Sequence, residues 1–108
     1  MSARPLVKNA ADEEQVSRAA ERQKTAREGE LEDLAAMLAN PQGRRVMWRL
    51  LEACGIFRSS FSAEAGLTAF NEGARNIGLM LLADINEACP QMYVTMLNEA
   101  RAREERNG

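Results

Sequence analysis

Residues 70–90 read FNEGARNIGLMLLADINEACP, and this stretch decides the fold. Its apolar positions recur at helical spacing, and they are Ala74, Ile77, Gly78, Leu81, Leu82, Ile85 and Cys89. Gly78 falls in the middle of this apolar face, where a glycine costs about 1 kcal/mol relative to alanine. We therefore predict that the preceding helix crosses close to Gly78. Gly73 lies nearer the beginning of the stretch, and we expect it to mark the turn into the helix.

A helical pattern lies on either side of this stretch. Asn40 suits the N-cap of the earlier helix, and Gly55 suits the left-handed residue that ends it. Pro90 stops the helix of residues 70–90 and can begin another. The apolar faces of the two flanking helices are Met47, Leu50, Leu51 and Cys54, and then Tyr93, Met96, Leu97 and Ala100. In the connector after Gly55, we expect Phe57 and Phe61 to plug the edge of the core.

The beginning of the chain has a different composition. Over residues 8–30 the only large aliphatic side chain is Val16, and the rest is mainly alanine, glutamine and mixed charge. Opposite charges four residues apart contribute only about 0.2–0.5 kcal/mol per pair, which cannot hold a helix without a packed apolar face. We therefore expect residues 1–10 to be disordered. Residues 11–29 are expected to be helical when a partner or a neighbouring copy supports them.

The pattern changes after Gly29, which we interpret as a weak point before the core. An apolar stripe then appears at Leu31, Leu34, Ala35 and Leu38. We divide the chain into a charged N-terminal extension, residues 1–30, and a helical core domain, residues 31–108. No segment shows the alternation typical of a half-buried strand. The predicted fold is all-α, a small helical bundle of three core helices preceded by a long charged N-terminal helix.

The bulk composition narrows the class of protein. The 108 residues suffice for one small domain, and 45% hydrophobic with 28% charged residues is typical of a soluble globular protein. The net charge of −2 provides no overall attraction to nucleic acid or to an anionic membrane. No run approaches the roughly 18 apolar residues of a membrane span, and the start lacks the apolar stretch of a secretory signal.

The sequence predicts no catalytic residue, no cofactor and no metal site. There is no histidine, so the usual base for nucleophilic catalysis is missing. Cys54 and Cys89 match no metal or redox spacing and are expected to be buried thiols. Asp84 and Glu87 share a helix face that we interpret as solvated. The turn serines are Ser59, Ser60 and Ser62, where local hydrogen bonding is expected. We therefore expect a protein that is not an enzyme.

A basic cluster, GRRVMWR, occupies residues 43–49. Arg44, Arg45 and Arg49, with Trp48 as a stacking aromatic, could contact nucleic acid. We favour the alternative that Trp48 packs partly into the core. The arginines would then be solvated or would pair with acidic residues, for which the candidates are Glu52, Glu72 and Asp84. Three arginines in a net-acidic chain are a weak electrostatic footprint for nucleic-acid binding.

Three apolar residues, Leu79, Met80 and Ala83, lie outside the inner face of the helix that holds Gly78. A helix that is apolar over most of its circumference is buried on two sides, and a short chain has few internal partners to offer. Methionines such as Met80 and Met92 suit adaptable contact surfaces. We therefore predict a protein interface at Leu79, Met80, Ala83 and Met92, with simple filling of the core as the alternative.

Two motifs carry a resemblance to a known family. The first motif is Gly-Arg-Arg, Trp-Arg-Leu-Leu and Cys-Gly, and the second is Asn-Glu-Gly-x-Arg-Asn-x-Gly. Over roughly Leu34 to Glu99 the chain resembles the Bordetella-phage Bbp-nineteen-like (Bbp19-like) family of small tailed-phage proteins. The positions that match are Gly43, Arg44, Trp48, Gly55, Gly73, Arg75, Asn76 and Gly78. We interpret them as positions that set the fold through caps, a close helix crossing and, at Arg75, either a solvated side chain or an inter-helix contact. The resemblance implies a virion or head-assembly component and carries no reaction signature.

Together these features predict a non-enzymatic phage structural protein that binds other virion proteins. The portal, the head–tail connector and the ejected internal proteins are the expected partners. We expect copies to assemble as a homo-oligomer in the particle, after synthesis in the cytoplasm of the bacterial host. Two alternatives stay open. One is a DNA-associated packaging or ejection factor that uses the basic cluster, and the other is a host-directed inhibitor that is absent from the particle.

Overall fold

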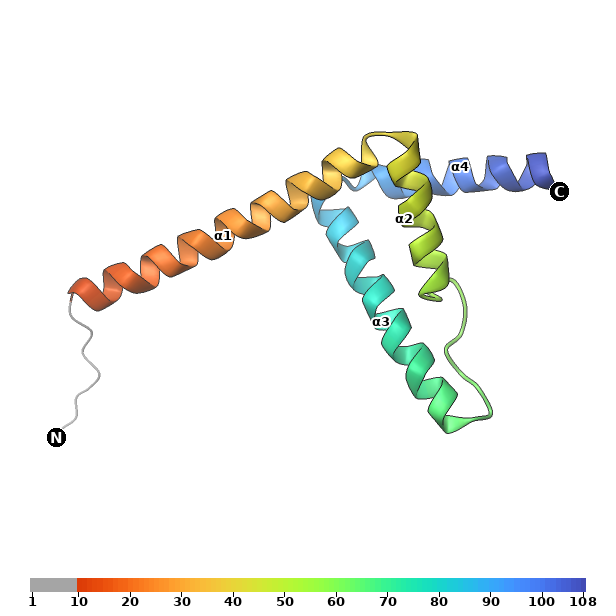
Figure 1. Ribbon diagram of the computed structural model, residues 1–108, viewed down its shortest axis with the longest axis horizontal. Helices are drawn as coiled ribbons and strands as arrows, with labels where there is room; N and C mark the ends of the chain where they lie inside the picture. The colour runs from red at the N-terminus through yellow and green to blue at the C-terminus, as the bar shows by residue number, and fades with distance from the viewer. Residues whose placement is uncertain (1–9) are drawn as a thin grey trace. The chain divides into compact units, whose positions relative to one another are not determined.

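The computed structural model describes residues 10–108, and these residues form four helices and no strand. The helices are α1 (Ala10–Leu38), α2 (Pro41–Ala53), α3 (Ala65–Ala88) and α4 (Gln91–Asn107) (Figure 1). The predicted all-α class is confirmed. The chain divides into two units, residues 1–30 and residues 31–108. Most of the segment predicted to be disordered lies outside the described residues, and Ala10 is already the first residue of α1.

In the first unit, the described residues belong to one helix with little to bury. Val16 is 53% exposed, and none of residues 10–30 is buried. Two ion pairs lie along this surface, Glu14 with Arg18 and Arg27 with Glu30. Helix α1 continues through Gly29 because a single glycine costs only about 1 kcal/mol among good helix formers.

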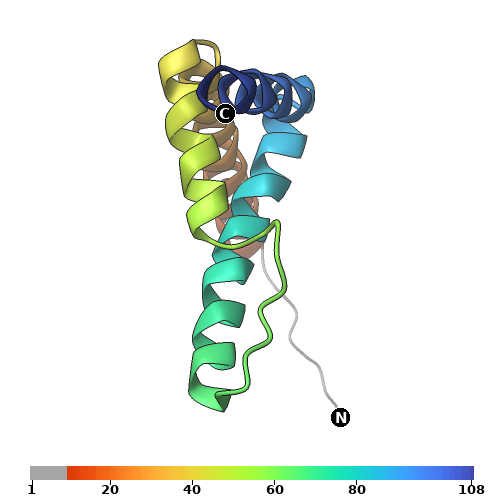
Figure 2. The same ribbon diagram turned by 90° about the vertical axis from the view of Figure 1, so that its right-hand side faces the viewer.

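The second unit builds its core from all four helices. Figures 1 and 2 show α2 and α3 side by side, with α4 across one end of the pair. The buried side chains are Leu38, Met47, Trp48, Leu51, Ile85, Cys89 and Met96. The stripe predicted at the end of α1 contributes, since Leu34 and Ala35 pack against this cluster and Leu38 is fully buried. No polar or charged residue is buried among the described residues, so apolar packing holds this unit together.

Four residues predicted to lie in or against the core are instead exposed, and one of them is Phe57, at 47%. Leu50 is 44% exposed, Ile77 is 52% exposed and Phe61 is 79% exposed. The buried face of α2 is centred between Met47 and Trp48, which leaves Leu50 at its edge, roughly 100° away around the helix. Ile77 precedes the buried Gly78 and is displaced from the core in the same way. Phe61 lies in the connector, which runs beside the part of α3 that extends past α2 (Figure 2).

Some glycines of the second unit lie where a larger residue would clash or be strained. A Cβ atom on Gly78 would overlap Cγ2 of Ile56 and lie 2.7 Å from Cβ of Cys54, which confirms the close crossing at the end of α2. Gly55 has a φ of +77°, the left-handed geometry predicted for the end of that helix. The prediction for Gly73 is wrong, because α3 already begins at Ala65 and Gly73 lies in its interior. The amide of Gly43 donates to the side chain of Asn40 over 2.8 Å, so Asn40 caps α2.

Candidate protein-interaction surface

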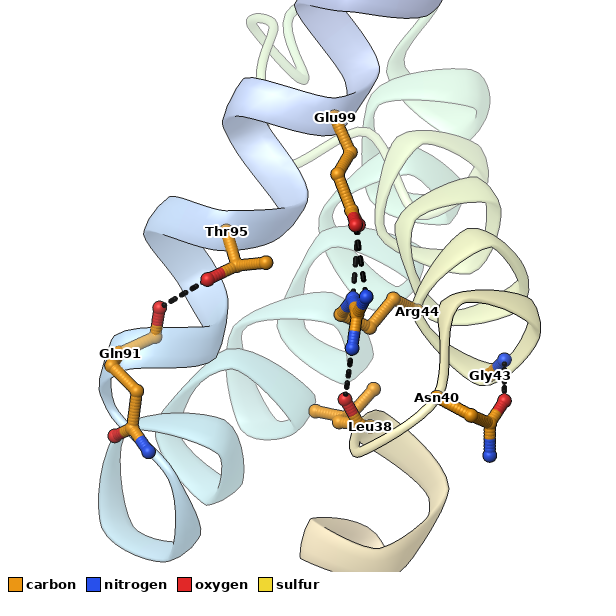
Figure 3. A network of polar contacts seen from close by, with 7 residues as sticks. All are labelled: Leu38, Asn40, Gly43, Arg44, Gln91, Thr95 and Glu99. Atoms are coloured by element: carbon orange, nitrogen blue, oxygen red, sulfur yellow. Dashed lines mark hydrogen bonds and ion pairs between the residues drawn. The ribbon is translucent and has the colours of Figure 1, made fainter.

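A bidentate ion pair connects α2 to α4. Nε and Nη2 of Arg44 each donate to a carboxylate oxygen of Glu99 over 2.9 Å, and Nη1 donates to the carbonyl of Leu38 over 3.0 Å (Figure 3). The side chains are 12% and 33% exposed. The hydrogen bonds from Arg44 lower the pKa of Glu99, and those to Glu99 raise the pKa of Arg44. Because the guanidinium also satisfies a carbonyl at the end of α1, Arg44 fastens three elements of the second unit.

The partner of Arg44 was not among the acidic residues considered from sequence. Glu99 lies 55 positions further along the chain, and no local spacing links the two. Arg45 and Arg103 lie close enough to Glu99 to lower its pKa further through their charges. The side chains of Arg45 and Arg49 are exposed.

The aromatic member of the basic cluster belongs to the core. Trp48 is 6% exposed, and its ring centroid lies 5.0 Å from that of Phe57 and 6.1 Å from that of Tyr93. An indole between two other rings, in a buried position, presents no open face on which a base could stack. Of the four residues considered for nucleic-acid contact, Arg44 is engaged in the ion pair with Glu99, Trp48 is buried, and Arg45 and Arg49 remain on the surface.

Helix α3 carries large apolar side chains on two exposed flanks. On one flank, Leu79 is 39% exposed and Ala83 is exposed one turn later. On the other, Phe70 is 72% exposed, Ile77 is 52% exposed and Met80 is 53% exposed. The two flanks are separated by roughly 100° around the helix, because consecutive residues such as 79 and 80 are rotated by that angle. Phe70 and Ile77 were not predicted to be part of this surface.

The fourth residue predicted for the interface has a different environment. Met92 is half-buried and packs against the core at the beginning of α4. On the same helix Val94 is 56% exposed. Among the described helices of the second unit, α3 carries the most exposed large apolar side chains, and Met92 belongs to the packing around the core.

Two polar residues predicted to set the fold, Arg75 and Asn76, lie on α3 as well. Asn76 is exposed in the middle of the helix, where it caps nothing. Arg75 is half-buried beside the connector. There it borders an open hollow whose lining is Ile56, Phe57, Arg58, Ser59, Ser60 and Arg75. The predicted local bonding is present at Ser59 and Ser62, whose hydroxyls accept from the amides of Phe61 and Glu64. Ser60 instead donates to Glu72, twelve positions further along the chain.

The cysteines and the acidic residues form no joint site in the described part of the chain. Cys54 and Cys89 are both free thiols, the first half-buried and the second buried. Burial raises the pKa of Cys89. Among residues 10–108, no three side chains of the His, Cys, Asp and Glu types gather closely enough to hold a metal ion. The helices described here are too short or too polar to span a membrane.

The comparisons with known proteins agree with the motifs of α2 and α3. The profile of a family described as Bbp19-like phage protein matches residues 34–98. The chain belongs to the Bbp19-like phage protein family. The match covers α2, α3 and the exposed surface of α3, and the predicted resemblance, which ran from Leu34 to Glu99, is confirmed. No curated protein and no solved structure gives a significant match to the chain.

Proposed function

We propose that this Bbp19-like phage protein is a non-enzymatic component of the phage particle or of its assembly, which binds other virion proteins through the exposed apolar surface of α3. The observation that carries the proposal is the exposure of Phe70, Ile77 and Met80 on one flank of a helix inside the matched segment. Burying the exposed part of a large apolar side chain stabilises a complex by roughly 1 kcal/mol or more. A helix that leaves several such side chains in water gains that stabilisation when a partner covers them.

The first unit supports an assembly role. Its described residues form a helix whose ion pairs, Glu14 with Arg18 and Arg27 with Glu30, are exposed. Exposed pairs contribute little, and an amphipathic contact is what normally maintains such a helix. Repetition of the chain around a symmetric vertex would provide that contact many times over. The portal, the head–tail connector and the ejected internal proteins are therefore the partners that we propose.

The two other functions receive less support. A DNA-associated factor would have to work without Trp48, which is buried, and without the guanidinium of Arg44, which Glu99 and Leu38 occupy. The exposed pair Arg45 and Arg49 is a small footprint in a chain of net charge −2. A host-directed inhibitor would use the same apolar surface, and it differs from our proposal only in being absent from the particle.

Quantitative mass spectrometry of purified particles tests the proposal. We expect the protein in intact particles at a copy number set by the symmetry of its partner. Emptied particles, analysed after DNA release, show whether it stays with the portal and connector or leaves with the ejected proteins. Absence from intact particles would refute the structural role and favour the inhibitor. Binding to DNA that weakens steeply with salt and is lost on replacement of Arg45 and Arg49 by alanine would favour the DNA-associated factor.

A further inference from the structure

We propose that a second copy of this chain covers one flank of α3, and that the two α3 helices pair in antiparallel orientation. The contact consists of Phe70, Gly73, Ile77 and Met80, which we call the α3 stripe. This inference rests on the proposed function, since it names one partner of the same surface. The pairing of the two α3 helices is nevertheless a property of the isolated protein and can be tested without the particle.

The spacing of the α3 stripe is that of a helix–helix seam. Its members are separated by three, four and three residues, the intervals at which one side of a helix meets another helix lengthwise. All three large side chains are at least half-exposed. The neighbouring positions are Ala69, Asn76 and Ala83 along one edge, and Leu67, Ala74 and Leu81 along the other. None of them is charged, so both edges can be desolvated without stranding a charge.

Gly73 has no internal explanation. It lies inside α3, where a glycine costs about 1 kcal/mol relative to alanine. A Cβ atom added there would meet nothing within 4 Å, in contrast to Gly78, which faces Ile56 and Cys54. A glycine between two exposed apolar residues leaves a gap in the helix surface that a side chain from outside the chain can fill.

The α3 stripe is complementary to itself in antiparallel orientation. With a two-fold axis level with residue 75, Gly73 faces Ile77 of the second copy, and Phe70 faces Met80 of the second copy. Each isoleucine then fills the gap above a glycine, and each thioether meets an aromatic ring, which is a favourable pairing. In parallel orientation, glycine would face glycine and isoleucine would face isoleucine, which leaves a void beside a bulge.

Charge weighs against the parallel pair. Asp84 and Glu87 continue the line of the α3 stripe toward the end of the helix. In parallel orientation each would face its own counterpart, and like charges repel. In antiparallel orientation they lie near the N-terminus of the other α3, where the helix dipole is positive. The N-cap residue of that helix is Glu64, which is itself acidic and forms no capping bond, so its charge offsets part of this attraction.

Sedimentation of the purified full chain over a range of concentrations tests the pairing. A contact along one helix is small compared with the roughly 800 Å² that a stable interface buries on each partner, so we expect dissociation in the micromolar range or weaker. Met80→Glu should raise the dissociation constant at least about tenfold, because it places two charges in the seam. Leu79→Glu is the matched control, since it adds the same charge at the adjacent residue, on the other flank of α3, and should leave the dimer intact. Circular dichroism verifies that both variants are folded.

Cysteine cross-linking tests the orientation. A mixture of Phe70→Cys and Met80→Cys chains should yield a disulfide between positions 70 and 80, identified as a bridged peptide by mass spectrometry. Phe70→Cys alone should yield no bridge between two copies of position 70. In the antiparallel pair those positions are about 15 Å apart along the axis, and a disulfide requires Cβ atoms about 4 Å apart.

Three results would overturn the inference: a monomer at every concentration up to about 1 mM, a dimer that survives Met80→Glu, or a 70–70 bridge without the 70–80 bridge. Failure here is distinct from failure of the proposed function. A monomeric protein that is found in particles retains the virion role and loses the dimer. A dimer that is missing from particles loses the virion role and retains the pairing.

Discussion

Replacing each of two glycines of α3 by alanine isolates the packing energy of the crossing between α2 and α3. Gly78→Ala adds a methyl group that overlaps Ile56 and lies 2.7 Å from Cβ of Cys54. Gly73→Ala adds the same group on the same helix with nothing within 4 Å. Both substitutions also remove the helix-propensity cost of glycine, about 1 kcal/mol in each case. The difference between the two variants is therefore the packing cost at residue 78.

The expected sizes follow from these contacts. Gly73→Ala should raise the free energy of unfolding by up to about 1 kcal/mol. Overpacking costs about 1–3 kcal/mol. Cβ of Cys54 is bonded directly to the main chain, so it can move away from the added methyl group only if the backbone shifts. After subtraction of the gain in helix propensity, Gly78→Ala should lower the free energy of unfolding by up to about 2 kcal/mol. The two variants should thus differ by about 1–3 kcal/mol.

Urea unfolding followed by tryptophan fluorescence measures this difference. Trp48 is the single tryptophan and is 6% exposed, so it reports on the core of the second unit. The protein concentration must be low enough to keep the chain monomeric, because Gly73 lies in the α3 stripe. If the two variants unfold within about 0.5 kcal/mol of each other, the spread within which distant, independent sites behave additively, then the helices do not cross closely at Gly78 and the reasoning fails.

The polar contacts and the thiols lead to three more expectations. Arg44→Ala should lower the melting temperature by several degrees in calorimetry, because Arg44 donates hydrogen bonds to both Glu99 and the carbonyl of Leu38. Arg45→Ala should leave the melting temperature unchanged, since the side chain of Arg45 is exposed. Glu99 has a lowered pKa in the folded protein, so its stabilising contribution is present at neutral pH and is lost as the pH falls below 4.5, the ordinary pKa of a glutamate. The difference in the free energy of unfolding between wild type and Glu99→Gln should therefore shrink over that range. A difference that is constant with pH would contradict the ion pair. Cys89, which is buried and has a raised pKa, should react with a thiol reagent more slowly than Cys54 in the native protein, and equal rates in a spectrophotometric assay would count against that placement.

The structure also changes which residues carry the functional argument. The sequence points to Leu79, Met80, Ala83 and Met92, and three of these are exposed on α3. The structure adds Phe70 and Ile77, which align with Met80, and it places Met92 against the core. The interface predicted from the helical pattern therefore lies mainly on α3 and shares Met80 with the α3 stripe, and it stays a prediction. The signal that could have revealed the stripe was the three-four-three spacing that runs through Gly73.

Local chemistry alone determined several features of this protein. The helical repeats predict the all-α class, Asn40 and Gly55 predict the ends of α2, and Gly78 predicts the close crossing. These features depend on residues that are neighbours in the chain, or on a glycine whose only role is to leave room. The motifs of α2 and α3 likewise sufficed to indicate the Bbp19-like family.

Only the tertiary structure decided which side of each helix is buried and what Arg44 binds. A periodic pattern locates a buried face to within about one residue, roughly 100° around the helix, and the neighbouring helices select the final angle. That selection buried Trp48 in place of Leu50, and it left Ile77 in water beside Gly78. The pairing of Arg44 with Glu99 spans 55 positions, and such a contact exists only after α2 and α4 have packed.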